Sequence, residues 1–391
     1  MLPNYYQFYC PVKILSGQLA VSNIPFEMNL LGCKRAMVVT DKGVVKAGLI
    51  DIVKSAFADS DVKIGRIFNE VPQDSSDRIA NRIAKMFKTE RCDCFIAVGG
   101  GSALDSAKGA NIVLSADSGN ILDFQGADKI TSDLHPLIAI PTTAGTGSEV
   151  TKVAVIYNET TETKMSFVSD KLYPNLAVID PRMTLTMPPM ITAATGMDAL
   201  THAVEAYICL QKNPIDDIFA KTAIDLIRRH LVHATEDGKN MEARMAMANA
   251  ALYAGIAFSN SMVGMVHALA HALGGVCHVP HGVANAVLLP WCLQYNIPKV
   301  PEYIAELSGL LGGAGAYLKP VEQAEETVLL IRNLLKKLNS VSGIPQKLRD
   351  AKVEKDQLSE AAQVAINDGA LIYNPREVSY EDALGVYQTA F

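Results

Sequence analysis

The chain has 391 residues, of which 49% are hydrophobic and 19% charged, and its formal charge at pH 7 is −6. This composition is typical of a globular protein with a large core, and the length favours two domains. Acidic and basic residues are interspersed without a basic block, so neither nucleic acid nor an anionic membrane is an expected partner.

The cysteines and the N-terminal sequence indicate the cellular compartment of the protein. Seven cysteines are scattered along the chain, and the closest pair, Cys92 and Cys94, fits neither a CxxC redox motif nor a zinc knuckle. The N-terminus has no basic segment followed by an apolar run, so no signal peptide is expected. These features predict reduced thiols and a cytoplasmic location.

The first half of the chain alternates short apolar runs with amphipathic stretches. This order is typical of an α/β domain with a parallel, Rossmann-like sheet and right-handed crossovers. The expected strands are Arg35–Asp41, Val62–Phe68, Cys94–Gly101, Pro136–Thr143 and Ala177–Pro181, and two expected helices are Asp77–Lys88 and Leu104–Leu114.

Two polar loops follow successive expected strands. The turn Gly99-Gly100-Gly101-Ser102 precedes a helix whose free N–H groups would face a pyrophosphate, and the hydroxyl-rich segment Pro141–Thr151 follows the next strand. Each loop alone also fits an ordinary turn, and the GxGxxG fingerprint is absent, but together they favour a nucleotide site. Asp41 can accept hydrogen bonds from a ribose and would repel a 2′-phosphate, which favours NAD over NADP.

After Pro188-Pro189 the pattern becomes helical almost throughout. We therefore predict an α/β dinucleotide-binding domain at 1–187 and an all-helical domain at 188–391. The stretch Met245–Cys277 has no Asp, Glu, Lys or Arg and is long enough to span a bilayer. Its asparagines, serines and histidines favour a pair of buried core helices instead.

Seven of the eight histidines fall between 202 and 281. Asp198 and His202 are four apart, so a helix would present both on one face, and His267 and His271 repeat that spacing. Gly274-Gly275 is expected to end the second helix, with His278 and His281 in the loop that follows. Three imidazoles and a carboxylate suit Fe²⁺ or Zn²⁺ about equally.

The simpler interpretation has to be weighed for each histidine. One Asp–His pair is more often a hydrogen bond than a metal site, but two such clusters in apolar sequence need a compensating charge, which a cation supplies. His230 and His233 lie in a polar helix end and His135 precedes a proline at a strand start, so ordinary structural roles are expected for these three.

Several segments together resemble the iron-containing (group III) alcohol dehydrogenase family, which has the dehydroquinate-synthase-like fold, and the resemblance covers nearly the whole chain. It is similar above all to the branch of bacterial ethanol, methanol and propanediol dehydrogenases. The segments are VVTDKG, GGGSALDSAKG, IPTTAGTGSEVT, YPNLAVIDP, TAATGMDALTHAVEAY, HALAHALGG with PHGVANAVLLP, and NPREVSYEDAL.

The resemblance implies roles for individual residues. The metal ligands would be Asp198, His202, His267 and His281, and His278 would be a bystander. His271 would lie beside the nicotinamide as a candidate for proton transfer, and Asp105 is a second candidate catalytic residue. The residues expected to line the dinucleotide are Asp41, Gly99, Gly100, Gly101, Ser102, Thr142, Thr143, Thr146, Ser148 and Lys164. The sequence departs from the family near Pro72, where Pro-Gln-Asp-Ser replaces Pro-Asn-Pro-Thr.

The implied reaction exchanges a hydride between a short primary alcohol or its aldehyde and NAD(H), with Fe²⁺, or Zn²⁺ or another divalent ion, polarising the substrate oxygen. Alternatives are a diol-specific dehydrogenase, a lyase or cyclase of the superfamily that uses NAD transiently, and a catalytically silent scaffold. Val153 would make the pocket apolar, and Phe258 would either limit substrate length or pack in the core. The family also implies a homodimer or a larger dimer-based oligomer.

Overall fold

The structure is a computed structural model that describes residues 3–115, 120–161, 163–314 and 318–391. These residues form two compact units. One is Cys10–Thr186, and the other is Met187–Phe391 together with residues 3–9. The predicted domains 1–187 and 188–391 differ from these units chiefly in the placement of the N-terminal residues, and they stay a prediction.

A six-stranded parallel sheet forms the centre of the first unit, with strand order β1-β9-β6-β4-β2-β3. All five expected strands are present, and the predicted fold class is confirmed. The sequence reasoning missed two features. One is β1, which is short and mostly exposed, and the other is a second, small sheet of order β5-β8-β7. The strands are β1 Lys13–Ser16, β2 Arg35–Val39, β3 Lys63–Phe68, β4 Cys94–Gly99, β5 Gly126–Ala127, β6 Leu137–Pro141, β7 Val153–Asn158, β8 Thr163–Val168 and β9 Leu176–Ile179.

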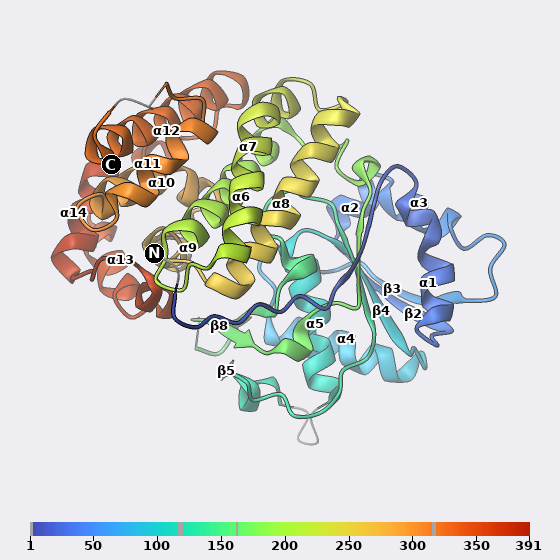
Figure 1. The fold of residues 1–391 in the computed structure, drawn as a ribbon. Helices are drawn as coiled ribbons and strands as arrows, with labels where there is room; N and C mark the ends of the chain where they lie inside the picture. Colours follow the sequence, from blue (N-terminus) through green and yellow to red (C-terminus); the bar gives the residue numbers. More distant parts are fainter. Residues whose placement is uncertain (1–2, 116–119, 162, 315–317) are drawn as a thin grey trace. The chain divides into compact units, whose positions relative to one another are not determined.

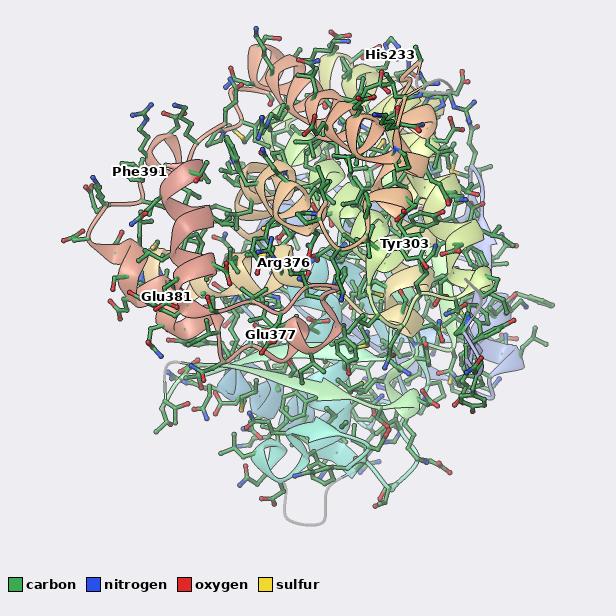
Figure 2. All side chains as sticks on the ribbon, turned by 60° about the vertical axis from the view of Figure 1, so that its left-hand side comes forward. His233, Tyr303, Arg376, Glu377, Glu381 and Phe391 are labelled. Carbon is green, nitrogen blue, oxygen red and sulfur yellow. The ribbon has the colours of Figure 1, made fainter. Side chains whose placement is uncertain are left out.

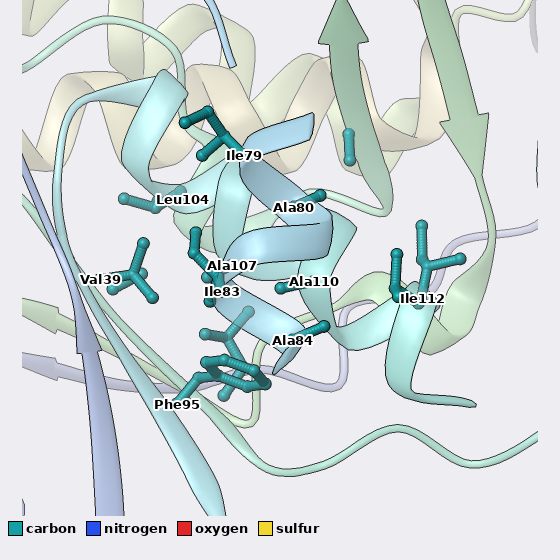
Figure 3. Packing of buried hydrophobic residues seen from close by; sticks show 14 of the residues in the cluster. Val39, Ile79, Ala80, Ile83, Ala84, Phe95, Leu104, Ala107, Ala110 and Ile112 are labelled. Atoms are coloured by element: carbon teal, nitrogen blue, oxygen red, sulfur yellow. The ribbon is translucent and has the colours of Figure 1, made fainter. Parts of the chain in front are cut away.

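Helices cover both faces of the six-stranded sheet (Figure 1). Alternate residues of each strand face opposite sides, so Val38 and Ile96 join the core beneath α1 and α3, whereas Val39 and Phe95 join the core beneath α4 and α5. Figure 3 shows the second core, where the apolar faces of α4 and α5 meet. The helices are α1 Ile24–Leu30, α2 Lys42–Lys46, α3 Leu49–Ser55, α4 Asp77–Thr89 and α5 Gly101–Ser115.

The second unit is helical, and no strand occurs among its described residues. The long helices α6, α7 and α8 pack side by side (Figure 1). The helices are α6 Pro189–Ile208, α7 Pro214–Glu236, α8 Met241–Ser261, α9 Met265–Cys277, α10 His281–Asn296, α11 Pro301–Leu310, α12 Pro320–Ser342, α13 Gln357–Ala365 and α14 Tyr380–Ala390. Short 3-10 helices occupy Ala20–Asn23, Ile121–Phe124, Ser148–Val150, Asp170–Leu172, Pro181–Met183, Arg349–Ala351 and Gly369–Tyr373 in the two units.

The uncharged stretch forms most of α8 and all of α9, and most of their side chains are buried. Among the described helices, none by itself has both the length and the apolar composition needed to cross a membrane. The bent pair α8 and α9, at 102° to each other, meets these two criteria jointly.

The expected C-terminal end of the helix that carries His267 and His271 is wrong. Helix α9 continues through Gly274 and Gly275 and ends at Cys277. The helix ends where His278 adopts a left-handed conformation with φ of 55°, a position more often taken by glycine or asparagine. Glycine in a helix costs about 1 kcal/mol relative to alanine but does not prevent helical φ and ψ. His281 consequently lies in the first turn of α10 rather than in a loop.

Candidate metal centre and dinucleotide loops

Three helices of the second unit bring together the four predicted metal ligands. Asp198 and His202 lie one turn apart on α6, His267 lies on α9, and His281 is the first residue of α10. Each offers one ligand atom, and these atoms all lie within 4.8 Å of one another. Asp198, His202 and His267 are buried, and His281 is partly buried.

The charge states in this cluster suit a cation. Burial by itself would raise the pKa of Asp198, but the neighbouring His202, His281 and His267 hold it below its usual value. Burial lowers the pKa of both His267 and His281 well below the usual value. The Asp198 carboxyl thus favours its ionised form, and His267 and His281 favour the neutral form, whose lone pairs are available to a metal.

Asn285 provides a direct test of whether a metal fits. Its Nδ2 atom lies 2.7 Å from Asp198 Oδ1, 3.1 Å from His281 Nε2 and 3.4 Å from His267 Nε2. Three atoms with lone pairs therefore converge on one electropositive group. The donor set, three imidazoles and one carboxylate, is one that Fe²⁺ and Zn²⁺ accept. The residues fit the predicted metal.

Two further residues adjoin the ligand cluster. The ring of Phe258 on α8 stacks on His202 with centroids 4.2 Å apart, so it borders the cluster, and its role in substrate length stays a prediction. His271 on α9 stacks against His281 with centroids 5.4 Å apart, and its Nδ1 atom lies 2.9 Å from Asp368 Oδ2. His271 is thus next to the four predicted ligands, and its proton-transfer role also stays a prediction.

Sequence reasoning missed two residues that contact these ligands. Glu205 on α6 lies 2.5 Å from His267 Nδ1, and burial raises its pKa to about 7. Asn285 on α10 is the second. A positional signal exists for both, because Glu205 follows His202 by three residues and Asn285 follows His281 by four, which places each pair on one helix face.

Three of the other histidines are not members of the ligand cluster. His233 is at the C-terminal end of α7 on the surface (Figure 2), where its side chain is 68% exposed. His230 lies one turn earlier on that helix. His135 belongs to the α/β unit, where its backbone N–H donates to Asn111 and its ring stands beside Phe87. These contacts agree with ordinary structural roles.

In the α/β unit, the glycine turn and the hydroxyl-rich loop lie against each other. Thr142 N–H donates to Gly99 O at 2.9 Å. A Cβ atom at Gly100 would stand 3.3 Å from Thr143 Oγ1, and one at Gly101 would stand 3.0 Å from Thr146 Cγ2. The absence of side chains at these positions lets the two backbones approach closely.

Asp41 joins the same edge of the sheet. It caps α2, accepting from Val44 N–H through Oδ1 at 2.9 Å. A Cβ atom at Gly99 would be 3.5 Å from Asp41 Oδ2. The fold thus brings Asp41 next to the glycine turn, as expected for strands that end at one edge of a parallel sheet.

A network of buried hydrogen bonds from Lys108 on α5 holds the hydroxyl-rich loop in place. Lys108 is 1% exposed, and its Nζ donates to the carbonyls of Ser148, Thr151 and Val153 at 2.8 to 2.9 Å. Burial lowers the pKa of Lys108 to about 8. The sequence reasoning gave Lys108 no such role, although it lies three residues after Asp105 on α5.

Asp105 and Ser148 belong to this network. Asp105 accepts from Ser148 Oγ at 2.8 Å and from Val155 N–H at 3.1 Å, and burial raises the pKa of Asp105. Ser148 Oγ also accepts from Lys108 at 3.1 Å. These contacts are those of residues that hold a loop in place. The predicted catalytic role of Asp105 and the predicted dinucleotide contact of Ser148 stay predictions.

The remaining two predicted cofactor residues contact the loop after Val71. Ser102 Oγ donates to the carbonyl of Gln73, and Lys164 on β8 forms a 3.0 Å ion pair with Asp74. Gln73 and Asp74 are two of the three residues that depart from the family pattern, and Ser75 is the third. The altered loop is therefore attached to the glycine turn and to β8.

Comparison with known proteins identifies the family. Residues 11–181 match the model of the iron-containing alcohol dehydrogenases, and residues 192–391 match the C-terminal model of the same family. The chain is 38% identical to 1,3-propanediol dehydrogenase of Klebsiella pneumoniae over 388 residues, which cover 99% of each chain. It is 34% identical to NAD-dependent methanol dehydrogenase of Bacillus methanolicus over 383 residues, covering 98% of this chain and 99% of the relative.

A solved structure agrees with these matches. A 1,3-propanediol oxidoreductase is superposed with a TM-score of 0.96 at 38% identity, covering 99% of this chain and 100% of the other. The chain belongs to the iron-containing alcohol dehydrogenase family. It is an alcohol dehydrogenase with a nicotinamide cofactor and a metal, and the Asp/His cluster fits the metal.

Proposed function

We propose that this enzyme interconverts short primary alcohols and their aldehydes with NAD⁺ and NADH, and that Asp198, His202, His267 and His281 hold the metal. The observation that carries the proposal is the convergence of these four ligand atoms within 4.8 Å in a buried setting. A bound divalent ion would polarise the substrate oxygen and stabilise negative charge on it.

The chain's own residues divide the remaining tasks. Asp41, the glycine turn and the threonines of the hydroxyl-rich loop would hold the dinucleotide, because their polar atoms gather at one edge of the sheet. Lys108 and Asp105 would keep that loop in place. His271, whose Nδ1 is held by Asp368, would move a proton through its other ring nitrogen.

A second candidate substrate class is a diol. The 38% identity with 1,3-propanediol dehydrogenase over 99% of both chains favours it. A 1,3-diol is also a primary alcohol, unsubstituted at the carbon next to the reacting one. It therefore fits the same chemistry, and a substrate panel separates it from the monohydric alcohols.

The ligand set can be tested by removing one ligand at a time. Asp198→Ala and His267→Ala should each lose bound metal and nearly all turnover, since each removes one of four donors. Binding of NAD⁺ should survive, because the proposed dinucleotide residues belong to the other compact unit. Metal content by elemental analysis, NADH formation and NAD⁺ titration calorimetry are the measurements. Full activity in a metal-free His267→Ala protein would refute the ligand assignment.

The oligomer and the location are also part of the proposal. A homodimer or a larger dimer-based assembly agrees with the open edge of the six-stranded sheet at β1, where three of the four residues are exposed. Light scattering after size-exclusion chromatography measures the mass. The cytoplasmic location expected from the scattered cysteines is tested by cell fractionation.

A further inference from the structure

Glu205 has the same low exposure as Asp198 but is not among the four ligands. Both side chains are 3% exposed. The Oε2 atom of Glu205 lies 2.5 Å from His267 Nδ1, which is the ring nitrogen directed away from the ligand cluster. The other ring nitrogen, Nε2, lies 3.9 Å from Asp198 Oδ1. One imidazole therefore connects the Glu205 carboxylate to the ligand cluster.

The Glu205 carboxylate also accepts hydrogen bonds from the backbone of the first turn of α9, which contains His267. Helix α9 begins after Gly264, which has no side chain to cap it. Glu205 from α6 takes over this task, because its Oε1 accepts from Val266 N–H at 2.6 Å and its Oε2 from His267 N–H at 3.4 Å. A Cβ atom at Gly264 would stand 3.2 Å from Glu205 Oε1, so the glycine leaves room for this contact.

We propose that Glu205 is a positioning residue for the metal, acting through His267. By accepting a hydrogen bond from Nδ1–H, Glu205 favours the tautomer in which Nε2 carries the lone pair. It also fixes the orientation of the His267 ring and the position of the first turn of α9. A carboxylate behind a ligand imidazole also increases the basicity of the ligand atom. The inference rests on the proposed ligand set.

The substitution Glu205→Gln tests whether the hydrogen-bond acceptors of Glu205 position His267, or whether the side chain only fills space. Glutamine has nearly the same shape, but it offers one acceptor oxygen where the carboxylate offers two. If its amide nitrogen faces His267, an N–H group meets Nδ1, which favours the tautomer with a proton on Nε2 and no lone pair for the cation. If its oxygen faces His267, the amide nitrogen opposes the N–H of Val266.

The experiment measures Zn²⁺ affinity rather than turnover. Metal-free wild type, Glu205→Gln and a control, Glu149→Gln, are titrated with Zn²⁺ against a chromophoric chelator. Glu149 is matched to Glu205 in burial, since both residues are 2% exposed, but it belongs to the α/β unit. We expect Glu205→Gln to bind Zn²⁺ about 10- to 100-fold more weakly and Glu149→Gln to bind like wild type. The Co²⁺-loaded Glu205→Gln protein should also show a changed absorption spectrum.

Each outcome is decisive. Equal Zn²⁺ affinity in wild type and Glu205→Gln overturns the inference and leaves the ligand set intact. An equal loss in both Gln variants also overturns it, since the effect is then general destabilisation. Wild type that binds no Zn²⁺ refutes the ligand set itself. If Glu205→Gln does not fold, ¹⁵N-histidine spectra of Zn²⁺-loaded wild type decide, with the His267 signals assigned by their absence in His267→Ala. A His267 Nδ1–H proton shifted downfield by a hydrogen bond to a carboxylate supports the inference, and an unprotonated Nδ1, or an Nδ1–H proton without that shift, overturns it.

Discussion

The Nδ1 atom of His271 lies 2.9 Å from the Oδ2 atom of Asp368, a residue 97 positions later in the chain. This contact fixes the ring of a histidine that adjoins the four predicted ligands without being one of them. With Nδ1 engaged, Nε2 is the nitrogen left for a substrate proton or for water. The pair is therefore the best-defined candidate for proton transfer among the described residues.

His271→Ala should lower kcat by about 100-fold while the metal content stays at the wild-type level, because general acid–base groups contribute about 10²- to 10⁴-fold. Asp368→Asn should show a smaller loss, since the ring remains but its orientation is no longer fixed by a charge. Steady-state kinetics and elemental analysis on the same preparations make the comparison. Unchanged kcat in His271→Ala would exclude a proton-transfer role.

Asp41 should set the choice of dinucleotide. Both Asp41→Gly and Asp41→Ser remove the carboxylate, and serine keeps a side-chain cap for α2. The ratio of kcat/KM for NAD⁺ to that for NADP⁺ should fall by about 10-fold or more, which corresponds to about 1.4 kcal/mol of removed repulsion. Asp51→Ser, at an exposed position in α3, is the matched control. Wild type that already prefers NADP⁺ would show that Asp41 is misassigned.

Val153 should favour substrates without a hydroxyl next to the reacting carbon. Valine cannot hydrogen-bond a second hydroxyl, and burying that hydroxyl unpaired costs about 1–3 kcal/mol. We expect kcat/KM to be higher for 1-propanol or 1-butanol than for 1,2-propanediol, and Val153→Asn to narrow the difference. A tenfold preference of wild type for the diol would refute the apolar pocket without affecting the metal and cofactor assignments.

Glu149 should make stability depend on pH. Burial raises the pKa of Glu149 from 4.5 to about 7, so between these values the folded protein binds a proton that the unfolded chain has released. The contribution of this group is therefore full below pH 4.5 and is lost as the pH rises to about 7. The total loss is about 3 kcal/mol, at about 1.4 kcal/mol per pKa unit.

The prediction for Glu149 is tested by comparing the free energy of unfolding of wild type with that of Glu149→Gln at each pH. The free energy of unfolding of wild type minus that of Glu149→Gln should fall between pH 4.5 and about pH 7, because glutamine does not titrate. A difference that is constant over this range would contradict the raised pKa. Comparing two proteins at each pH removes the contribution of the other titrating groups they share.

Local patterns in the sequence were sufficient for much of the α/β unit. The five expected strands and the helices α4 and α5 are present because each apolar run or amphipathic stretch specifies its own element. Spacing of four residues also brought Asp198 and His202 to one face of α6. The edge strand β1 was missed because its residues are mostly exposed and lack an apolar pattern.

What the sequence by itself determined was therefore the set of local elements, the residue types of the candidate metal ligands and, through the family resemblance, the class of reaction. Only the tertiary structure decided which distant groups meet. Glu205 and His267 are 62 positions apart, and Lys108 and Val153 are 45 apart, so no periodicity links them. Such pairs form because buried polar groups require partners, and the packing of helices and strands determines which partners are within reach.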